Sequence, residues 1–177
     1  DIQMFKIKLF FIIFISSKLL SQELPPIQSF MMDDYNASGQ NWMISQSSNG
    51  DILFANNDGL LVYNGNKWNS YSSTNNTIVR SVNSINDIVY TGENSDFGFW
   101  IKQKNGSYVY TSIPNKYEFE LFEDEEFWNI LEFKNWIVFQ SLDRFIFFDP
   151  ISEVISSIRQ RVEFSSHLSL IIIYFFL

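Results

Sequence analysis

The sequence predicts an all-β protein built from about three repeated, four-stranded antiparallel units. Aromatic residues make up 18% of the 177-residue chain, and aromatic and β-branched side chains favour strands. Short apolar runs alternate with turns that contain Gly, Asn and Asp. This arrangement recurs at a spacing close to the roughly 40 to 50 residues of a propeller blade. We therefore expect a partial β-propeller, preceded by a signal peptide.

The clearest unit covers residues 41–71. Its dipeptides Asn49-Gly50, Asp58-Gly59 and Asn64-Gly65 lie between β-prone runs, and such dipeptides are the strongest short-range hairpin signal. Four strands are therefore predicted, over residues 42–46, 52–56, 60–64 and 68–71.

A second unit is predicted over residues 78–112 and a third over 127–158. Turn residues Asp51, Asp87 and Asn135 take equivalent places in the three units. A single β-sandwich would also place strands every 8 to 12 residues. Blades are preferred because Trp42 and Trp128 open their units in the similar contexts WMI and WNI. The nearly unbroken apolar runs ILFA, IVYT and WIVFQ predict strands that are buried on both faces between neighbouring blades.

The N-terminal residues 1–22 are predicted to be three upstream residues and a secretory signal peptide. Met4 is the expected start, Lys6 and Lys8 form a basic region, and LFFIIFI forms a short apolar core. Cleavage is expected near Ser21 or Gln22. A transmembrane anchor would need about 20 apolar residues, and Lys18 interrupts this run. Residues 23–40 follow as an extended segment, because residues before proline avoid helical geometry.

Composition excludes several classes of function. The net charge of −8 argues against nucleic-acid binding, which depends on clustered Lys and Arg. The absence of cysteine excludes disulfides, thiolate metal sites, a Cys nucleophile and a lipoprotein anchor. The single histidine, His167, lies in an atypical tail and is given no role. We therefore predict neither a cofactor, nor a metal, nor catalytic residues.

Blade-motif residues point to a family. The first unit contains Asp58-Gly59-Leu60, then Tyr63-Asn64-Gly65, then Trp68. These motifs, together with ELPPIQSF, QNWMISQ, TGENSDFGFW and EDEEFWNILEF, resemble the two-component regulator propeller repeats of exported regulators that also carry a triple-tyrosine domain. The resemblance covers roughly residues 22–158.

The resemblance implies a sensory role on the periplasmic or cell-surface side of a Gram-negative envelope. It also implies further blades, a membrane span and a helix-turn-helix or histidine-kinase output beyond this chain. The ligand of related sensors is often a glycan fragment.

Two parts of the chain depart from the family pattern. Phe97-Gly98-Phe99-Trp100 stands in place of the DGL strand in the second unit, and Asp143-Arg144-Phe145 lacks the glycine in the third. Residues 159–177 abandon the turn-and-strand rhythm and end almost wholly apolar. We interpret them as a frameshifted or read-through tail in preference to a last buried strand, and the chain as a truncated head of such a regulator.

Three local features resemble functional sites. The acidic run at residues 123–126 is interpreted as a solvated loop between blades and not as the paired carboxylates of a glycosidase. Asn56-Asn57-Asp58-Gly59 superficially resembles a calcium loop, but Gly65 occupies the position of the bidentate Glu. Trp100 and Trp128 are the candidates for stacking on a ligand, although tryptophans at fixed blade positions more often pack between blades.

The leading hypothesis is a non-catalytic, ligand-binding propeller segment of an exported, membrane-linked regulator of the two-component type. A secreted propeller scaffold for protein contacts is the alternative, and an exported carbohydrate-active enzyme is the third. Because an open arc of blades leaves apolar faces and strand edges unpaired, residues 23–177 alone are predicted to be poorly soluble or oligomeric.

Overall fold

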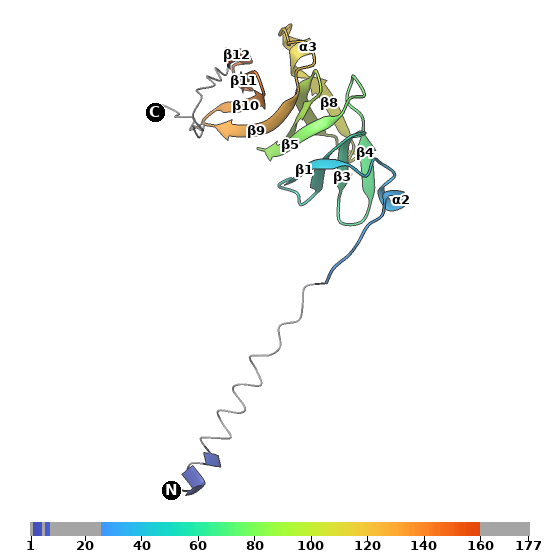
Figure 1. Cartoon of the computed structure of the whole chain (residues 1–177), viewed down its shortest axis with the longest axis vertical. Helices are drawn as coiled ribbons and strands as arrows, with labels where there is room; N and C mark the ends of the chain where they lie inside the picture. Colours follow the sequence, from blue (N-terminus) through green and yellow to red (C-terminus); the bar gives the residue numbers. More distant parts are fainter. Residues whose placement is uncertain (1, 5, 8–25, 160–177) are drawn as a thin grey trace, which may run out of the picture. The chain divides into compact units, whose positions relative to one another are not determined.

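The computed structural model describes residues 2–4, 6–7 and 26–159 (Figure 1). Most of the predicted signal peptide and nearly all of the predicted tail lie outside these residues. No helix in the described part of the chain is long and apolar enough to cross a membrane. Residues 1–30 and 31–177 form two separate units, and the fold below belongs to the second.

The described residues of this unit form three four-stranded antiparallel sheets, and each follows the chain as a simple meander. We call them blades 1, 2 and 3. Blade 1 contains β1 (Asn41–Gln46), β2 (Ile52–Asn56), β3 (Gly59–Tyr63) and β4 (Trp68–Tyr71). Blade 2 contains β5 (Val79–Ile85), β6 (Ile88–Glu93), β7 (Phe97–Lys102) and β8 (Tyr108–Ser112). Blade 3 contains β9 (Phe127–Phe133), β10 (Trp136–Ser141), β11 (Arg144–Asp149) and β12 (Val154–Arg159).

Two short helices accompany the blades: α2 (Met32–Tyr35) precedes blade 1, and α3 (Ile113–Tyr117) follows β8. The all-β, partial-propeller class predicted from the sequence is therefore confirmed. The turn residues predict the strands, because each turn fixes where a strand ends, and the similar contexts of Trp42 and Trp128 favour blades over a sandwich.

The first strands of the three blades lie side by side, β1 against β5 and β5 against β9. Each first strand also carries a register shift close to its start. The shift falls at Trp42 in β1, at Arg80 in β5 and at Trp128 in β9. A bulge re-aims the residue that it leaves unpaired, so three equivalent residues can converge.

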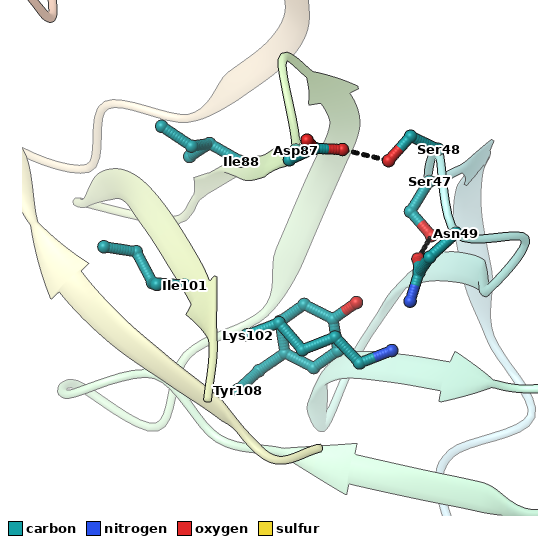
Figure 2. A pocket seen from close by; sticks show the side chains of 8 residues that line it. All are labelled: Ser47, Ser48, Asn49, Asp87, Ile88, Ile101, Lys102 and Tyr108. Atoms are coloured by element: carbon teal, nitrogen blue, oxygen red, sulfur yellow. Dashed lines mark hydrogen bonds between the residues drawn. The ribbon is translucent and has the colours of Figure 1, made fainter. Parts of the chain in front are cut away.

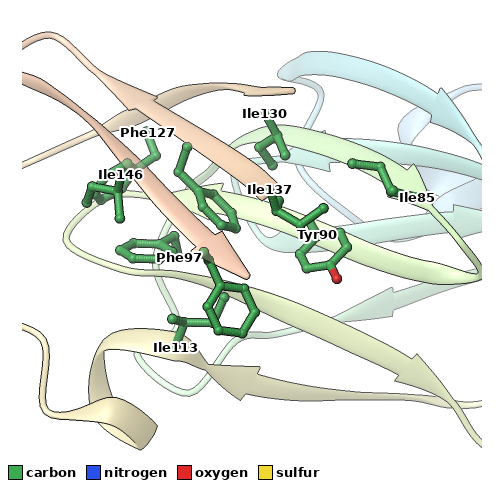
Figure 3. Packing of buried hydrophobic residues seen from close by; sticks show 10 residues of the cluster. Ile85, Tyr90, Phe97, Ile113, Phe127, Ile130, Ile137 and Ile146 are labelled. Atoms are coloured by element: carbon green, nitrogen blue, oxygen red, sulfur yellow. The ribbon is translucent and has the colours of Figure 1, made fainter. Parts of the chain in front are cut away.

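Two hydrophobic cores lie between the blades. Between blades 1 and 2 the core contains Leu53, Leu60 and Trp100 among its buried members. Between blades 2 and 3 it is richer in phenylalanine (Figure 3). There the Phe97 ring lies 4.8 Å from that of Phe127 and 4.5 Å from that of Phe139.

Blade 2 is consequently buried on both faces. In β6, Val89 packs into the core shared with blade 1, and the next residue, Tyr90, packs into the core shared with blade 3. This explains why IVYT shows no alternation between apolar and polar residues.

Candidate functional site

The DGL residues of blade 1 shape the turn between β2 and β3. The Asp58 carboxylate accepts a hydrogen bond from the Ser38 backbone N–H at 2.7 Å. Gly59 has φ +125°, and a Cβ built on it would lie 2.2 Å from the Tyr71 carbonyl oxygen. Leu60 is fully buried. This turn therefore fixes the residues that lead into the blade, and only glycine fits at position 59.

The second half of the motif forms the β3–β4 turn. Asn64 Oδ1 accepts hydrogen bonds from the backbone N–H groups of Lys67 (2.8 Å) and Asn66. Gly65 has φ +87°, and Tyr63 packs on Trp68 with ring centroids 4.6 Å apart. These residues shape and pack the blade.

The two tryptophans that the sequence offers as candidates for ligand stacking lie in different environments. Trp100 is only 1% exposed, and its Nε1 donates to Thr91 Oγ1 at 2.8 Å. Its ring therefore has no free face. Trp128 is half-buried near the bulge of β9 and belongs to a cluster of residues at the first strands.

This axial cluster consists of the three bulge residues Trp42, Arg80 and Trp128. The Arg80 guanidinium lies 4.3 Å from the Trp42 ring centroid and 4.9 Å from that of Trp128. The two rings meet edge to face at 5.8 Å. Arg80 also pairs with Glu126 at 2.8 Å, so its charge is largely neutralised. Trp42 is 41% exposed and offers the most accessible ring of the cluster.

A cavity of about 610 Å³ lies at the other end of the first strands, between blades 1 and 2 (Figure 2). Ligand pockets in proteins range over roughly 300 to 1,000 Å³. Blade 1 contributes polar residues of its β1–β2 turn, and blade 2 contributes its β5–β6 turn and the ends of β7 and β8. The lining residues are Ser47, Ser48, Asn49, Asp87, Ile88, Ile101, Lys102 and Tyr108.

A buried carboxylate, Asp51, holds the walls of this cavity together. It accepts hydrogen bonds from Lys102 Nζ at 2.5 Å, Tyr108 Oη at 2.9 Å and Asn49 Nδ2 at 3.2 Å. Burial alone would raise the pKa of Asp51, but the hydrogen bonds from Lys102, Tyr108 and Asn49 outweigh it and lower that pKa. Because Lys102 and Tyr108 come from blade 2, this ionised carboxylate ties the two blades together. Ser48 and Asp87 form a further hydrogen bond between the blades (Figure 2).

The acidic run at residues 123–126 is not wholly solvated, so that part of the sequence interpretation is wrong. Glu125 is 2% exposed and forms a bidentate pair with Arg144, with N–O distances of 2.9 and 2.7 Å. Ser141 Oγ donates to the same carboxylate at 2.7 Å. Burial alone would raise the pKa of Glu125, but the hydrogen bonds, Arg144 foremost, lower it.

The β2–β3, β6–β7 and β10–β11 turns occupy equivalent places in the three blades. We define the clamp of a blade as this turn together with the last residue of the strand before it and the first residue of the strand after it. The clamp of blade 1 holds Ser38 through Asp58 and through Asn56, whose Nδ2 donates to the Ser38 carbonyl at 2.7 Å. The clamp of blade 3 holds Glu125 through Ser141 and Arg144. Each clamp fastens the segment that leads into its own blade.

Comparison with solved structures finds the same fold in the extracellular domain of BT4673 from B. thetaiotaomicron, assigned to a one component system in one structure and to a hybrid two component system in another. The TM-scores are 0.51 and 0.53 at 18% and 19% sequence identity. The matches cover 67% and 70% of this chain but only 15% and 16% of those chains.

No protein-family model matches the chain, and comparison with curated proteins gives no match. The resemblance to two-component regulator propellers is thus confirmed at the level of the fold.

Sequence reasoning missed the cavity and the role of Arg80. The cavity residues come from three turns of two blades, and no local pattern marks them. Arg80 could have been found, since it occupies the same place in its unit as Trp42 and Trp128 occupy in theirs.

Proposed function

We propose that this chain is the beginning of a sensory, non-catalytic propeller of an exported regulator of the two-component type, and that the cavity between blades 1 and 2 binds its ligand. The observation that carries the proposal is that two different blades build this cavity. A ligand bound there contacts both blades, so binding favours one arrangement of the blades over others. The fold shared with the extracellular domain of BT4673 supports this role.

The ligand class we propose is a glycan fragment. Ile88 and Ile101 offer apolar surface to a sugar ring, while Ser48, Asn49 and Lys102 offer hydrogen-bonding groups for its hydroxyls (Figure 2). In this proposal the regulator acts on the periplasmic or cell-surface side of a Gram-negative envelope. Its further blades, membrane span and output domain lie in parts of the protein beyond this chain.

The test is calorimetric titration of the chain with a panel of oligosaccharides. Ser48→Trp places an indole in the cavity mouth and should abolish binding of any oligosaccharide that the unmodified chain binds. Ser70→Trp is the matched control, because Ser70 is an exposed residue of β4 in the same blade and does not line the cavity. Equal binding by both variants, or no binding by the unmodified chain to any member of the panel, would contradict the proposal.

A further inference from the structure

The clamp of blade 2 differs in chemistry from the other two, because it is built from two carboxylic acids. Glu93 is the last residue of β6 and Asp96 immediately precedes β7. They are 0% and 1% exposed. The Glu93 N–H donates to the Asp96 carbonyl at 2.9 Å, so the turn between them is closed. Both belong to the turn that faces residues 72–78, the linker from blade 1.

Asp96 has a full set of partners. Its Oδ1 accepts hydrogen bonds from Ser112 Oγ at 2.7 Å and from the Phe97 N–H at 2.8 Å. Its Oδ2 accepts a long one, 3.4 Å, from Asn75 Nδ2 of the linker. Asp96 therefore fastens the linker weakly and the end of β8 strongly.

Within the described part of the chain, Glu93 forms a well-formed hydrogen bond on one oxygen only. Thr91 Oγ1 donates to its Oε1 at 3.1 Å, and Trp100 Nε1 donates to the same Thr91 oxygen. Glu93 Oε2 is buried without a well-formed hydrogen bond in the described part of the chain, as are two neighbouring hydroxyls, Ser73 Oγ of the linker and Tyr110 Oη of β8. Both hydroxyls lie close enough to donate to Glu93, which lowers its pKa, but burial outweighs them.

No cation faces this cluster among the described residues. The charged group that acts on Glu93 is Asp96, which has the same sign. Glu125 and Glu126 lie on the next linker, where their backbones meet Ser95 and Asn94. Their side chains pair with Arg144 and Arg80 respectively, so neither arginine is available to Glu93.

Burial, reinforced by the Asp96 charge, raises the pKa of Glu93 to about 7. Burial also raises the pKa of Asp96, and burial with the two carboxylates raises that of Tyr110. Glu93 can therefore exchange a proton near neutral pH.

We propose that Glu93 is a proton-operated latch between blades 1 and 2. The protonated carboxyl closes the network between the β6–β7 turn and the linker that carries Ser73, and the ionised carboxylate opens it.

Burial, the charge of Asp96 and hydrogen bonding together explain the two states. A neutral carboxyl donates one hydrogen bond and still accepts others, so Oε2–H can donate to Ser73 Oγ or Tyr110 Oη. An ionised carboxylate only accepts, and the two hydroxyls can donate to it. It nevertheless lies buried beside a second acid, with no cation facing it among the described residues, and this cost outweighs the two hydrogen bonds. Loss of the proton therefore favours movement of the linker, and with it of blade 1, that lets water reach Glu93.

Tryptophan fluorescence tests the latch, because Trp100 is joined to Glu93 through Thr91. The full chain is titrated from pH 5.5 to 9 in the background of His167→Gln, which removes the one histidine. We expect a transition with a midpoint near pH 7 that is absent in Glu93→Gln. In parallel, the melting temperature should fall by about 5 to 10 °C from pH 5.5 to pH 8 in the parent and not in that variant.

Glu123→Gln is the matched control, since it makes the same change at an exposed acid and should leave the transition in place. Asp96→Asn removes the neighbouring charge and should move the midpoint to lower pH, which keeps the test valid if Glu93→Gln fails to fold. The proposal is overturned if no transition occurs, if it survives Glu93→Gln, or if Asp96→Asn leaves its midpoint unchanged. It is also overturned if Ca²⁺ or Mg²⁺ restores the lost stability at pH 8, since a metal ion would then be the natural occupant.

Discussion

Blades 2 and 3 use equivalent turns, their clamps, to fasten the segments that lead into them, but the two clamps differ in the charges they bury. Blade 3 uses a buried Glu125–Arg144 ion pair, whereas blade 2 uses Glu93 and Asp96 without a cation in the described structure. The comparison shows that the fold fixes the position of the clamp and leaves its chemistry free. One clamp is then expected to be rigid at neutral pH and the other to respond to pH.

The largest expected effect comes from breaking the clamp of blade 3. Arg144→Met leaves Glu125 buried without its cation, which should cost about 3 to 5 kcal/mol of unfolding free energy at pH 7. The loss should shrink as the pH falls, because the unpaired Glu125 can then take up a proton. Urea unfolding followed by circular dichroism measures both effects.

Lys116→Met is the control for this change. It removes the partner of Glu153 in an ion pair whose side chains are 43% and 55% exposed, and no measurable loss of stability is expected. An Arg144→Met variant as stable as Lys116→Met would show that the clamp of blade 3 does not hold the blade.

A smaller effect is expected at the clamp of blade 1. Gly59→Ala should cost about 1 to 3 kcal/mol, because its Cβ meets the Tyr71 carbonyl and its φ is positive. Gly50→Ala separates the two causes, since Gly50 also has positive φ but has open space around it. Equal losses in thermal unfolding would mean that the contact with Tyr71 contributes nothing.

The sequence predicted the blades well because their turns are local. Asn-Gly and Asp-Gly dipeptides set each hairpin by backbone geometry alone, so strand positions followed without knowledge of the tertiary structure. The departure of blade 2 from the DGL motif also has a local reason. In its β6–β7 turn the residue with positive φ is Ser95 and not a glycine.

The cavity and the clamps could not be predicted in this way. Lys102 and Asp51 meet across two blades, and the burial of Glu125 depends on Arg144 from a distant turn. From the sequence alone an acidic run is expected to be solvated, because the cation that pairs with Glu125 and permits its burial lies elsewhere in the chain. Trp100 is a candidate for ligand stacking from the sequence for the same reason, since only the packing of blade 1 against blade 2 covers its ring.

The most direct test of the contrast between the clamps is the unfolding free energy of Glu93→Gln and Glu125→Gln at pH 8. The pKa of Glu93 is raised from 4.5 to about 7, so its contribution is present below pH 4.5, falls as the pH rises to about 7, and is lost above it. That loss is roughly 3 kcal/mol, and Glu93→Gln should recover much of it at pH 8. The pKa of Glu125 is lowered, so its contribution is present above pH 4.5 and Glu125→Gln should destabilise the protein at pH 8. Opposite signs at pH 8 are the predicted result; destabilisation by both variants would contradict the account.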